Sequence, residues 1–204
     1  MKPIRRTDNS ITGVMTGLVI ENSDAEGLCR VRVSYPWHDN PLESYWARLA
    51  MPMAGSGRGL VLVPEVGDEV LVAFERGDLR FPYVLGSLWN SKDRPPLSNS
   101  DGKNDKRELL SRKKHYLLFD DGDSGIVELA HERGRKITFN DQGFVVQDEN
   151  GNAVKVDSNS GAMTIEATGH LSIRAASISI EASGTMEVKA SGTLTLLGSL
   201  ININ

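Results

Sequence analysis

The sequence lacks most features that mark a secreted, membrane-bound or nucleic-acid-binding protein. It has one cysteine, Cys29, so no disulfide can form within the chain. No apolar run approaches the roughly 18 residues of a membrane-spanning helix, and the polar residues 1–10 contain no apolar signal segment. The formal net charge of −4 disfavours bulk binding to nucleic acid or anionic membranes. We therefore expect synthesis and assembly in the cytoplasm.

Long amphipathic helices are also missing from the pattern. Short apolar–polar alternations are separated by turn-forming residues, and no early segment keeps a 3.6-residue period. Cys29 shares a predicted strand face with Val31 and Val33, which makes it a candidate core residue. Short strands of this kind predict an all-β fold that begins with a five-stranded barrel. This part of the sequence contains six candidate strands, at residues 14–20, 29–33, 46–51, 59–63, 69–74 and 80–86.

Composition divides the chain into five segments. Residues 1–12 form a polar N-terminal arm, and residues 13–92 form the barrel. Residues 93–112 are rich in Pro, Ser, Asn and charge, which is typical of a linker. Residues 113–160 resume short strands and form a β-rich stem. The stem leads into the last segment, residues 161–204, without a new linker.

Residues 161–204 carry a repeat with a period of about eight residues, each block holding two apolar residues two positions apart. Gly, Ser and Ala between the blocks favour corners, and the alternation within a block is that of a strand. The first apolar row is Met163, Leu171, Ile178, Met186, Leu194 and Ile201. The second row is Ile165, Ile173, Ile180, Val188, Leu196 and Ile203.

One chain cannot enclose these two rows, because an isolated series of short strands leaves its edges and one face in water. A single-chain β-helix would favour a period of about six residues, and a calcium-binding roll one of about nine. A period of about eight with a corner after each strand fits three chains wound around one axis. We therefore predict an intertwined trimeric β-helix whose core is the twelve residues of the two rows. An ordinary β-sandwich is the alternative.

The barrel segment also carries a family likeness. The stretches EGLCRVRVSYPW (Glu26–Trp37), Tyr45–Asp78 and FPYVLGSLWN (Phe81–Asn90) resemble the OB barrel of phage baseplate assembly protein V and of VgrG-like central spike proteins of contractile injection systems. The eight-residue repeat resembles the triple-stranded β-helix of the same family. The order of barrel, linker and β-helix also matches.

This resemblance implies a structural, non-enzymatic homotrimer. It would stand on a baseplate hub protein, belong to a virion or injection particle assembled in the bacterial cytoplasm, and puncture a target membrane when the sheath contracts. A PAAR-type tip protein would bind the C-terminal end, formed by Ile201, Asn202, Ile203 and Asn204. The lysozyme domain that some family members carry between barrel and β-helix is absent here. So is the His-x-His pair that binds iron at the apex of the simpler spikes.

We expect no catalytic, metal or cofactor site. The segment GDSG (Gly122–Gly125) looks like the nucleophile segment of a serine protease, but no matching His context accompanies Ser124, so a β-turn is the better interpretation. Asp120, Asp121 and Asp123 lack the spacing of an EF-hand. His38, His115, His131 and His170 are scattered along the chain rather than set at ligand spacing.

An alternative function is an OB-fold module that binds oligosaccharide or nucleic acid and is trimerised by its tail. Trp37, Trp46, Phe74, Phe81 and Tyr83 would then be stacking platforms for bases or sugars. The aromatic content of 6% and the acidic net charge argue against nucleic acid. Core or trimer contacts are the simpler interpretation of these rings.

Overall fold

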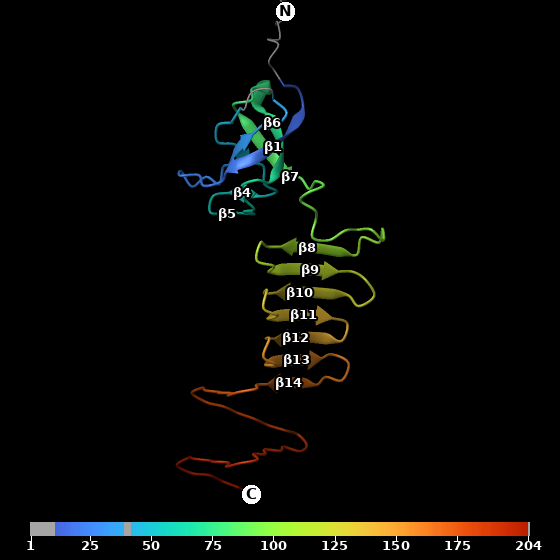
Figure 1. Cartoon of the computed structure of the whole chain (residues 1–204). Helices are drawn as coiled ribbons and strands as arrows, with labels where there is room; N and C mark the ends of the chain where they lie inside the picture. Colours follow the sequence, from blue (N-terminus) through green and yellow to red (C-terminus); the bar gives the residue numbers. More distant parts are fainter. Residues whose placement is uncertain (1–10, 39–41, 204) are drawn as a thin grey trace, which may run out of the picture. The chain divides into compact units, whose positions relative to one another are not determined.

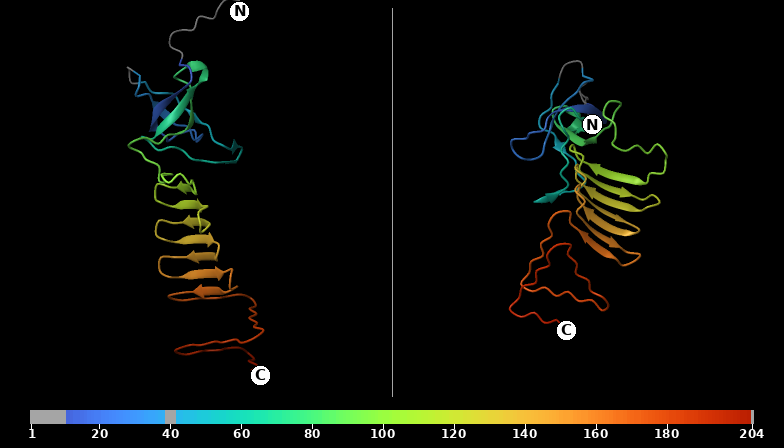
Figure 2. Two further views of the ribbon diagram at one scale, coloured as in Figure 1. Left: turned by 90° about the vertical axis from the view of Figure 1, so that its right-hand side faces the viewer. Right: turned by 60° about the horizontal axis from the view of Figure 1, so that its bottom comes forward.

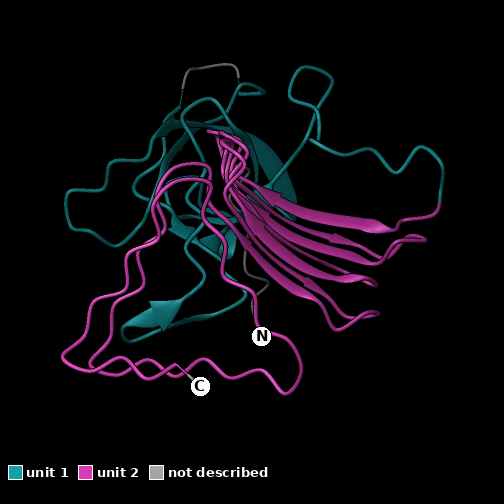
Figure 3. Ribbon diagram, turned by 90° about the horizontal axis from the view of Figure 1, so that it is seen from below, with its two compact units in different colours: residues 1–102 teal, residues 103–204 magenta. Residues whose placement is uncertain are grey.

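The computed structural model describes residues 11–38 and 42–203 and divides into two compact units, residues 1–102 and 103–204 (Figure 3). Residues 1–10 of the predicted arm and Asn204 lie outside the described residues. The predicted all-β class is confirmed, since the described part of the chain has strands and one short 3-10 helix, η1 (Glu75–Gly77). None of its helices is long and apolar enough to cross a membrane.

Unit 1 is built on a five-stranded sheet with the strand order β2-β1-β6-β7-β3, and a separate hairpin pairs β4 with β5. Val31, next to β2, bridges to Ala47, next to β3, so the two outer strands of the sheet are also linked. This is the curled sheet expected of an OB domain. The strands are β1 (Val14–Glu21), β2 (Arg32–Ser34), β3 (Arg48–Leu49), β4 (Ala54–Gly55), β5 (Arg58–Gly59), β6 (Glu69–Phe74) and β7 (Pro82–Ser87).

The core of unit 1 consists mainly of valines, whose branched side chains suit a pleated surface. Tyr35 is buried among them, and its hydroxyl donates a hydrogen bond to the Leu79 carbonyl oxygen at 3.0 Å. Burial raises the pKa of Tyr35 above its ordinary value, so the phenol stays neutral. The fully enclosed members are Val19, Val31, Val33, Tyr35, Ala47, Val70, Val72 and Val84.

Two sequence expectations for this unit were wrong. Cys29 is exposed, not in the core, because its φ of 53° turns the chain out of the strand. The loop before β2 closes around Asp24, whose carboxylate accepts the Leu28 N–H and a two-pronged hydrogen bond from Arg30. The expected strand at 59–63 is also shorter, since β5 ends at Gly59.

Unit 2 contains a seven-stranded antiparallel sheet in which every strand pairs with its neighbour in sequence (Figures 1 and 2). Most of its strands are five residues long, so the sheet is a narrow ladder. Its first strand lies within the segment that composition assigns to the linker. The strands are β8 (Lys106–Leu110), β9 (Tyr116–Asp120), β10 (Ile126–Ala130), β11 (Lys136–Asn140), β12 (Gly143–Gln147), β13 (Ala153–Asp157) and β14 (Met163–Glu166).

Tight turns set the register of this ladder. Between β11 and β12 the Asn140 side-chain oxygen accepts the N–H groups of Gln142 at 3.0 Å and Gly143 at 3.1 Å. Gly143 has a φ of 144°, and a Cβ there would clash with the carbonyl of Val156 on β13. Only glycine tolerates both this positive φ and the close approach of the Val156 carbonyl. The position therefore favours one alignment of three successive strands.

Candidate assembly surface

The register of unit 2 places apolar residues in two columns on one face of the sheet. Each residue lies directly opposite its column neighbours on the adjacent strands. The first column is Leu109, Leu117, Leu129, Ile137, Val146, Val154 and Ile165. The second is Phe119, Val127, Phe139, Phe144, Val156 and Met163, with Arg107 at its start. We call this surface the apolar face.

The apolar face is uncovered in the single chain. Leu129 is 55% exposed, Phe139 50% and Leu109 53%, and similar side chains surround them. Complete burial of such a side chain contributes roughly 1.5–3 kcal/mol. A continuous apolar surface of this extent is unusual on a soluble monomer and marks an interaction site.

The two columns lead directly into the two rows of the eight-residue repeat. Met163 and Ile165 are the first members of those rows, and both lie in β14. Met163 pairs with Val156, and Ile165 pairs with Val154. The apolar face and the repeat therefore share one surface through β14.

The other ten predicted core residues lie beyond β14, where no strand is assigned among the described residues. Here the chain stops folding back on itself and runs in extended sides joined by corners (Figures 2 and 3). Between residues 169 and 203 the described chain forms no backbone–backbone hydrogen bond. Exposure of the ten side chains ranges from 49% at Ile201 to 85% at Ile203.

These extended sides leave the apolar side chains exposed and the backbone without backbone partners in one copy. Backbone N–H and C=O groups in a folded segment need hydrogen-bond partners. The predicted tip-binding residues Ile201, Asn202 and Ile203 belong to this stretch, and Asn204 lies outside the described residues. The role of all these residues stays a prediction.

The opposite face of the ladder has its own polar cluster. Glu128 on β10 is only 8% exposed and accepts hydrogen bonds from Lys136 Nζ at 2.8 Å, Thr138 Oγ1 at 2.6 Å and the Tyr116 hydroxyl. Burial alone would raise the pKa of Glu128, but these three donors outweigh it, and its pKa is lowered. The same contact raises the pKa of Tyr116 to about 12. This face satisfies its buried charge internally.

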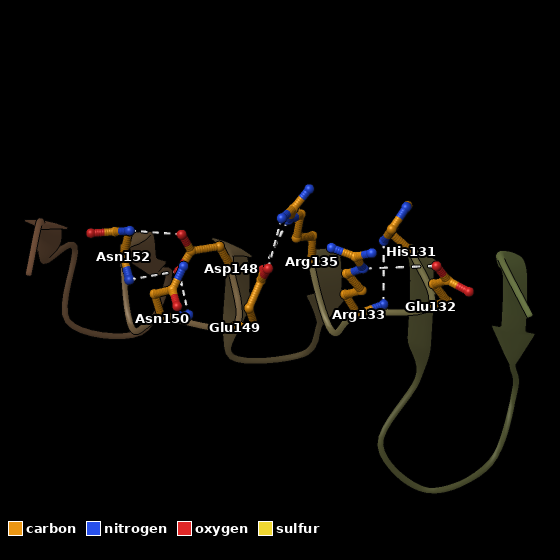
Figure 4. A network of polar contacts seen from close by, with 8 residues as sticks. All are labelled: His131, Glu132, Arg133, Arg135, Asp148, Glu149, Asn150 and Asn152. Carbon is orange, nitrogen blue, oxygen red and sulfur yellow. Dashed lines mark hydrogen bonds and ion pairs between the residues drawn. The ribbon is translucent and has the colours of Figure 1, made fainter.

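Short-range polar contacts also tie together the turns along one side of the ladder (Figure 4). Arg135 forms a two-pronged pair with Glu149 at 2.7 and 2.8 Å, and Asp148 accepts from the Asn152 amide at 2.6 Å. The rings of His115 and His131 stack with centroids 4.4 Å apart. Their spacing in the sequence gave no sign of this pairing, which depends on the strand register.

The aromatic side chains proposed as stacking platforms are mostly engaged within unit 1. Phe74 lies edge-on to Tyr35, with centroids 5.5 Å apart, and Trp37 donates its ring N–H to the Thr16 carbonyl oxygen at 2.6 Å. Arg48 covers Tyr83 at 4.8 Å, and Arg80 lies over Phe81 at 5.5 Å. The guanidinium of Arg30 lies 5.8 Å from the Trp46 ring. These contacts favour a structural role for the rings.

The segment predicted as a turn, Gly122–Gly125, joins β9 to β10, and the Gly125 N–H donates to the Gly122 carbonyl at 3.0 Å. Across the described ranges, no cluster of three or more His, Cys, Asp or Glu residues is positioned to hold a metal ion. The feature that calls for a function is therefore the uncovered apolar surface of unit 2.

Comparison with known families identifies unit 1. Residues 15–89 match the family model of the type VI secretion system/phage-baseplate injector OB domain. The chain therefore contains an OB domain of the injector family, as the sequence resemblance predicted.

Individual relatives are spike proteins of type VI secretion systems. The chain is 38% identical over 98 residues to the type VI secretion system spike protein VgrG5 of Pseudomonas aeruginosa, covering 45% of this chain and 12% of the relative. It is 33% identical over 101 residues to the spike protein VgrG3 of Vibrio cholerae, covering 46% and 10%. It is also 30% identical over 101 residues to the actin cross-linking toxin VgrG1 of Vibrio cholerae, covering 46% and 9%. The aligned part thus spans about a tenth of these relatives.

Proposed function

We propose that this chain is the structural central spike of a contractile tail or injection system. In this proposal three copies wind together through unit 2, and the OB domain of unit 1 mounts the spike on a baseplate hub. The assembly would be built in the bacterial cytoplasm and would puncture a target membrane on sheath contraction. Its role is mechanical, with no active site.

The observation that carries the proposal is the continuity of the apolar surface. One apolar column crosses all seven strands of the ladder and the other runs from β9 to β14, and both pass through Ile165 or Met163 into the eight-residue repeat. Between residues 169 and 203 the described chain also lacks backbone–backbone hydrogen bonds. Further copies of the same chain would cover the apolar side chains and supply the missing strand partners together.

The relatives supply the link to an injection apparatus, because they are named as spike proteins of type VI secretion. The tip-protein site at Ile201, Asn202, Ile203 and Asn204 is a separate part of the proposal. Its support is the exposure of Ile201 and Ile203, which offer apolar surface to a partner.

The mass of the assembly tests the proposal. Native mass spectrometry of the purified chain is expected to give a single species at three times the chain mass of 22.3 kDa. A monomer or a dimer at micromolar concentration would overturn it. Electron microscopy of the trimer with a candidate hub protein would then test the mounting of unit 1.

A further inference from the structure

The turns of the ladder in unit 2 alternate between its two sides, and the two sides carry opposite charge. Turns 111–115 (SRKKH), 131–135 (HERGR) and 148–152 (DENGN) lie on one side, which we call the basic edge. Together they hold five Lys or Arg residues and three carboxylates. Turns 121–125 (DGDSG) and 141–142 (DQ) lie on the other side, which we call the acidic edge. They hold three Asp residues and no cation.

Contacts within the chain leave part of this charge uncompensated. Arg135 pairs with Glu149, Arg133 with Glu132 and Asp121 with Arg107. For the exposed side chains of Lys113, Lys114, Asp123 and Asp141, no ion pair occurs within the part of the chain that the structure describes.

The two edges are also too far apart to neutralise each other. The strands between them are five residues long, and such a strand spans about 17 Å at about 3.4 Å per residue. This separation is about twice the Debye length of roughly 8 Å at physiological ionic strength. The charge of each edge is therefore available to interact with a neighbouring molecule.

We propose that the basic edge of one copy lies against the acidic edge of the next copy, so that the ladders close head-to-tail into a ring. The inference rests on the proposed function, which supplies the number of copies as three. Each copy offers one edge of each kind, as a closed cyclic contact requires. The apolar faces then point inward, and every seam joins opposite charges.

The heights of the turns fit this arrangement. Turn 111–115 joins β8 to β9, whereas turn 121–125 joins β9 to β10. In a symmetric ring the basic turn of one copy is thus offset along the ladder by one strand spacing, about 4.8 Å, from the acidic turn of its neighbour. Long Lys and Arg side chains can reach over that distance. Contacts between like edges would be repulsive, so the charges also select the order in which the faces meet.

Charge reversal on the full-length chain tests the inference. K113D/K114D makes both edges acidic, and D123K/D141K makes both edges basic. At about 0.02 M salt each variant is expected to dissociate at least about tenfold more readily than the wild type, and at about 0.5 M salt the difference should shrink. The combined four-site variant exchanges the two edges and is expected to regain most of the lost trimer. Native mass spectrometry over a dilution series provides the measurement.

R58D/K92D is the matched control for K113D/K114D, because it makes the same change in net charge within unit 1. It is expected to leave the trimer unchanged. If the wild type is trimeric but the edge reversals have no more effect than this control, the edges do not face one another. A four-site variant that does not regain the trimer lost in the two double variants would likewise overturn the inference. A wild type that is not trimeric would instead overturn the proposed function.

Discussion

At the scale of single residues, Glu128 is the one charged residue that is buried in the described part of unit 2. It lies on the face of the ladder opposite the apolar columns. Lys136, Thr138 and Tyr116 all donate to its carboxylate, which compensates for its removal from water. A buried carboxylate with three donors holds β9, β10 and β11 in one register, since a one-residue slip would separate the charge from its partners.

The lowered pKa of Glu128 predicts a pH dependence of stability. Its contribution is fully present above the pKa of an unfolded Glu, about 4.3, and is lost as the pH falls through the lower folded pKa. Glu128→Gln is expected to lower the free energy of unfolding by about 1–3 kcal/mol at neutral pH. The difference between wild type and variant should diminish as the pH is lowered through this range. Denaturant unfolding at one protein concentration provides the measurement, and a difference that stays constant with pH would contradict the prediction.

At the scale of secondary structure, the ladder and the repeat share an alternating apolar pattern but differ in how their strands are paired. In the ladder each strand pairs with its sequence neighbour, because turns of a few residues reverse the chain. After β14 the Gly, Ser and Ala corners no longer reverse the chain (Figure 2). The extended sides are left without strand partners in one copy. Only the ladder forms its backbone hydrogen bonds within a single chain.

A carboxylate in an apolar row of the repeat should prevent assembly. Ile180→Asp or Val188→Asp would place three charges close together inside a closed trimer, where both desolvation and mutual repulsion are unfavourable. We expect either variant to be largely monomeric by light scattering after size exclusion. Ser179→Asp introduces the same charge on the alternate side of the strand and is expected to remain trimeric. Trimeric I180D together with trimeric V188D would mean that this row does not face inward.

At the scale of the whole molecule, the two units differ in how complete they are. Unit 1 encloses its own core of eight buried residues. Unit 2 has only three buried side chains in its ladder, Ala130, Ala153 and Glu128, and its apolar face is uncovered. The need for further copies therefore belongs to unit 2.

Truncation is expected to separate these properties. A fragment of residues 1–102 should fold, because it keeps its own core, and should be monomeric, because it lacks the apolar face. Near-ultraviolet circular dichroism reports the packing of its aromatic residues, and light scattering reports its mass. A folded trimeric fragment would move the assembly site to the OB domain.

Much of the fold could be predicted from local pattern. The alternation at Glu69–Phe74 predicted β6 with its observed bounds. The sequence of the barrel segment is specific enough to match the injector OB domain without knowledge of its three-dimensional structure. The predicted core position of Cys29 was wrong, because the loop that closes around Asp24 overrides the alternation of neighbouring residues.

Local sequence was enough to predict the strand-forming segments, the family of the OB domain and the two apolar rows of the repeat, because each depends on residues near one another in the chain. Tertiary structure alone decided that Leu109 and Phe119 begin columns that continue into those rows. It also brought His115 to His131 and sorted the charged turns onto opposite edges. These features depend on strand register, which is set by turn lengths and by pairing between segments, and a periodic pattern within one segment cannot specify it.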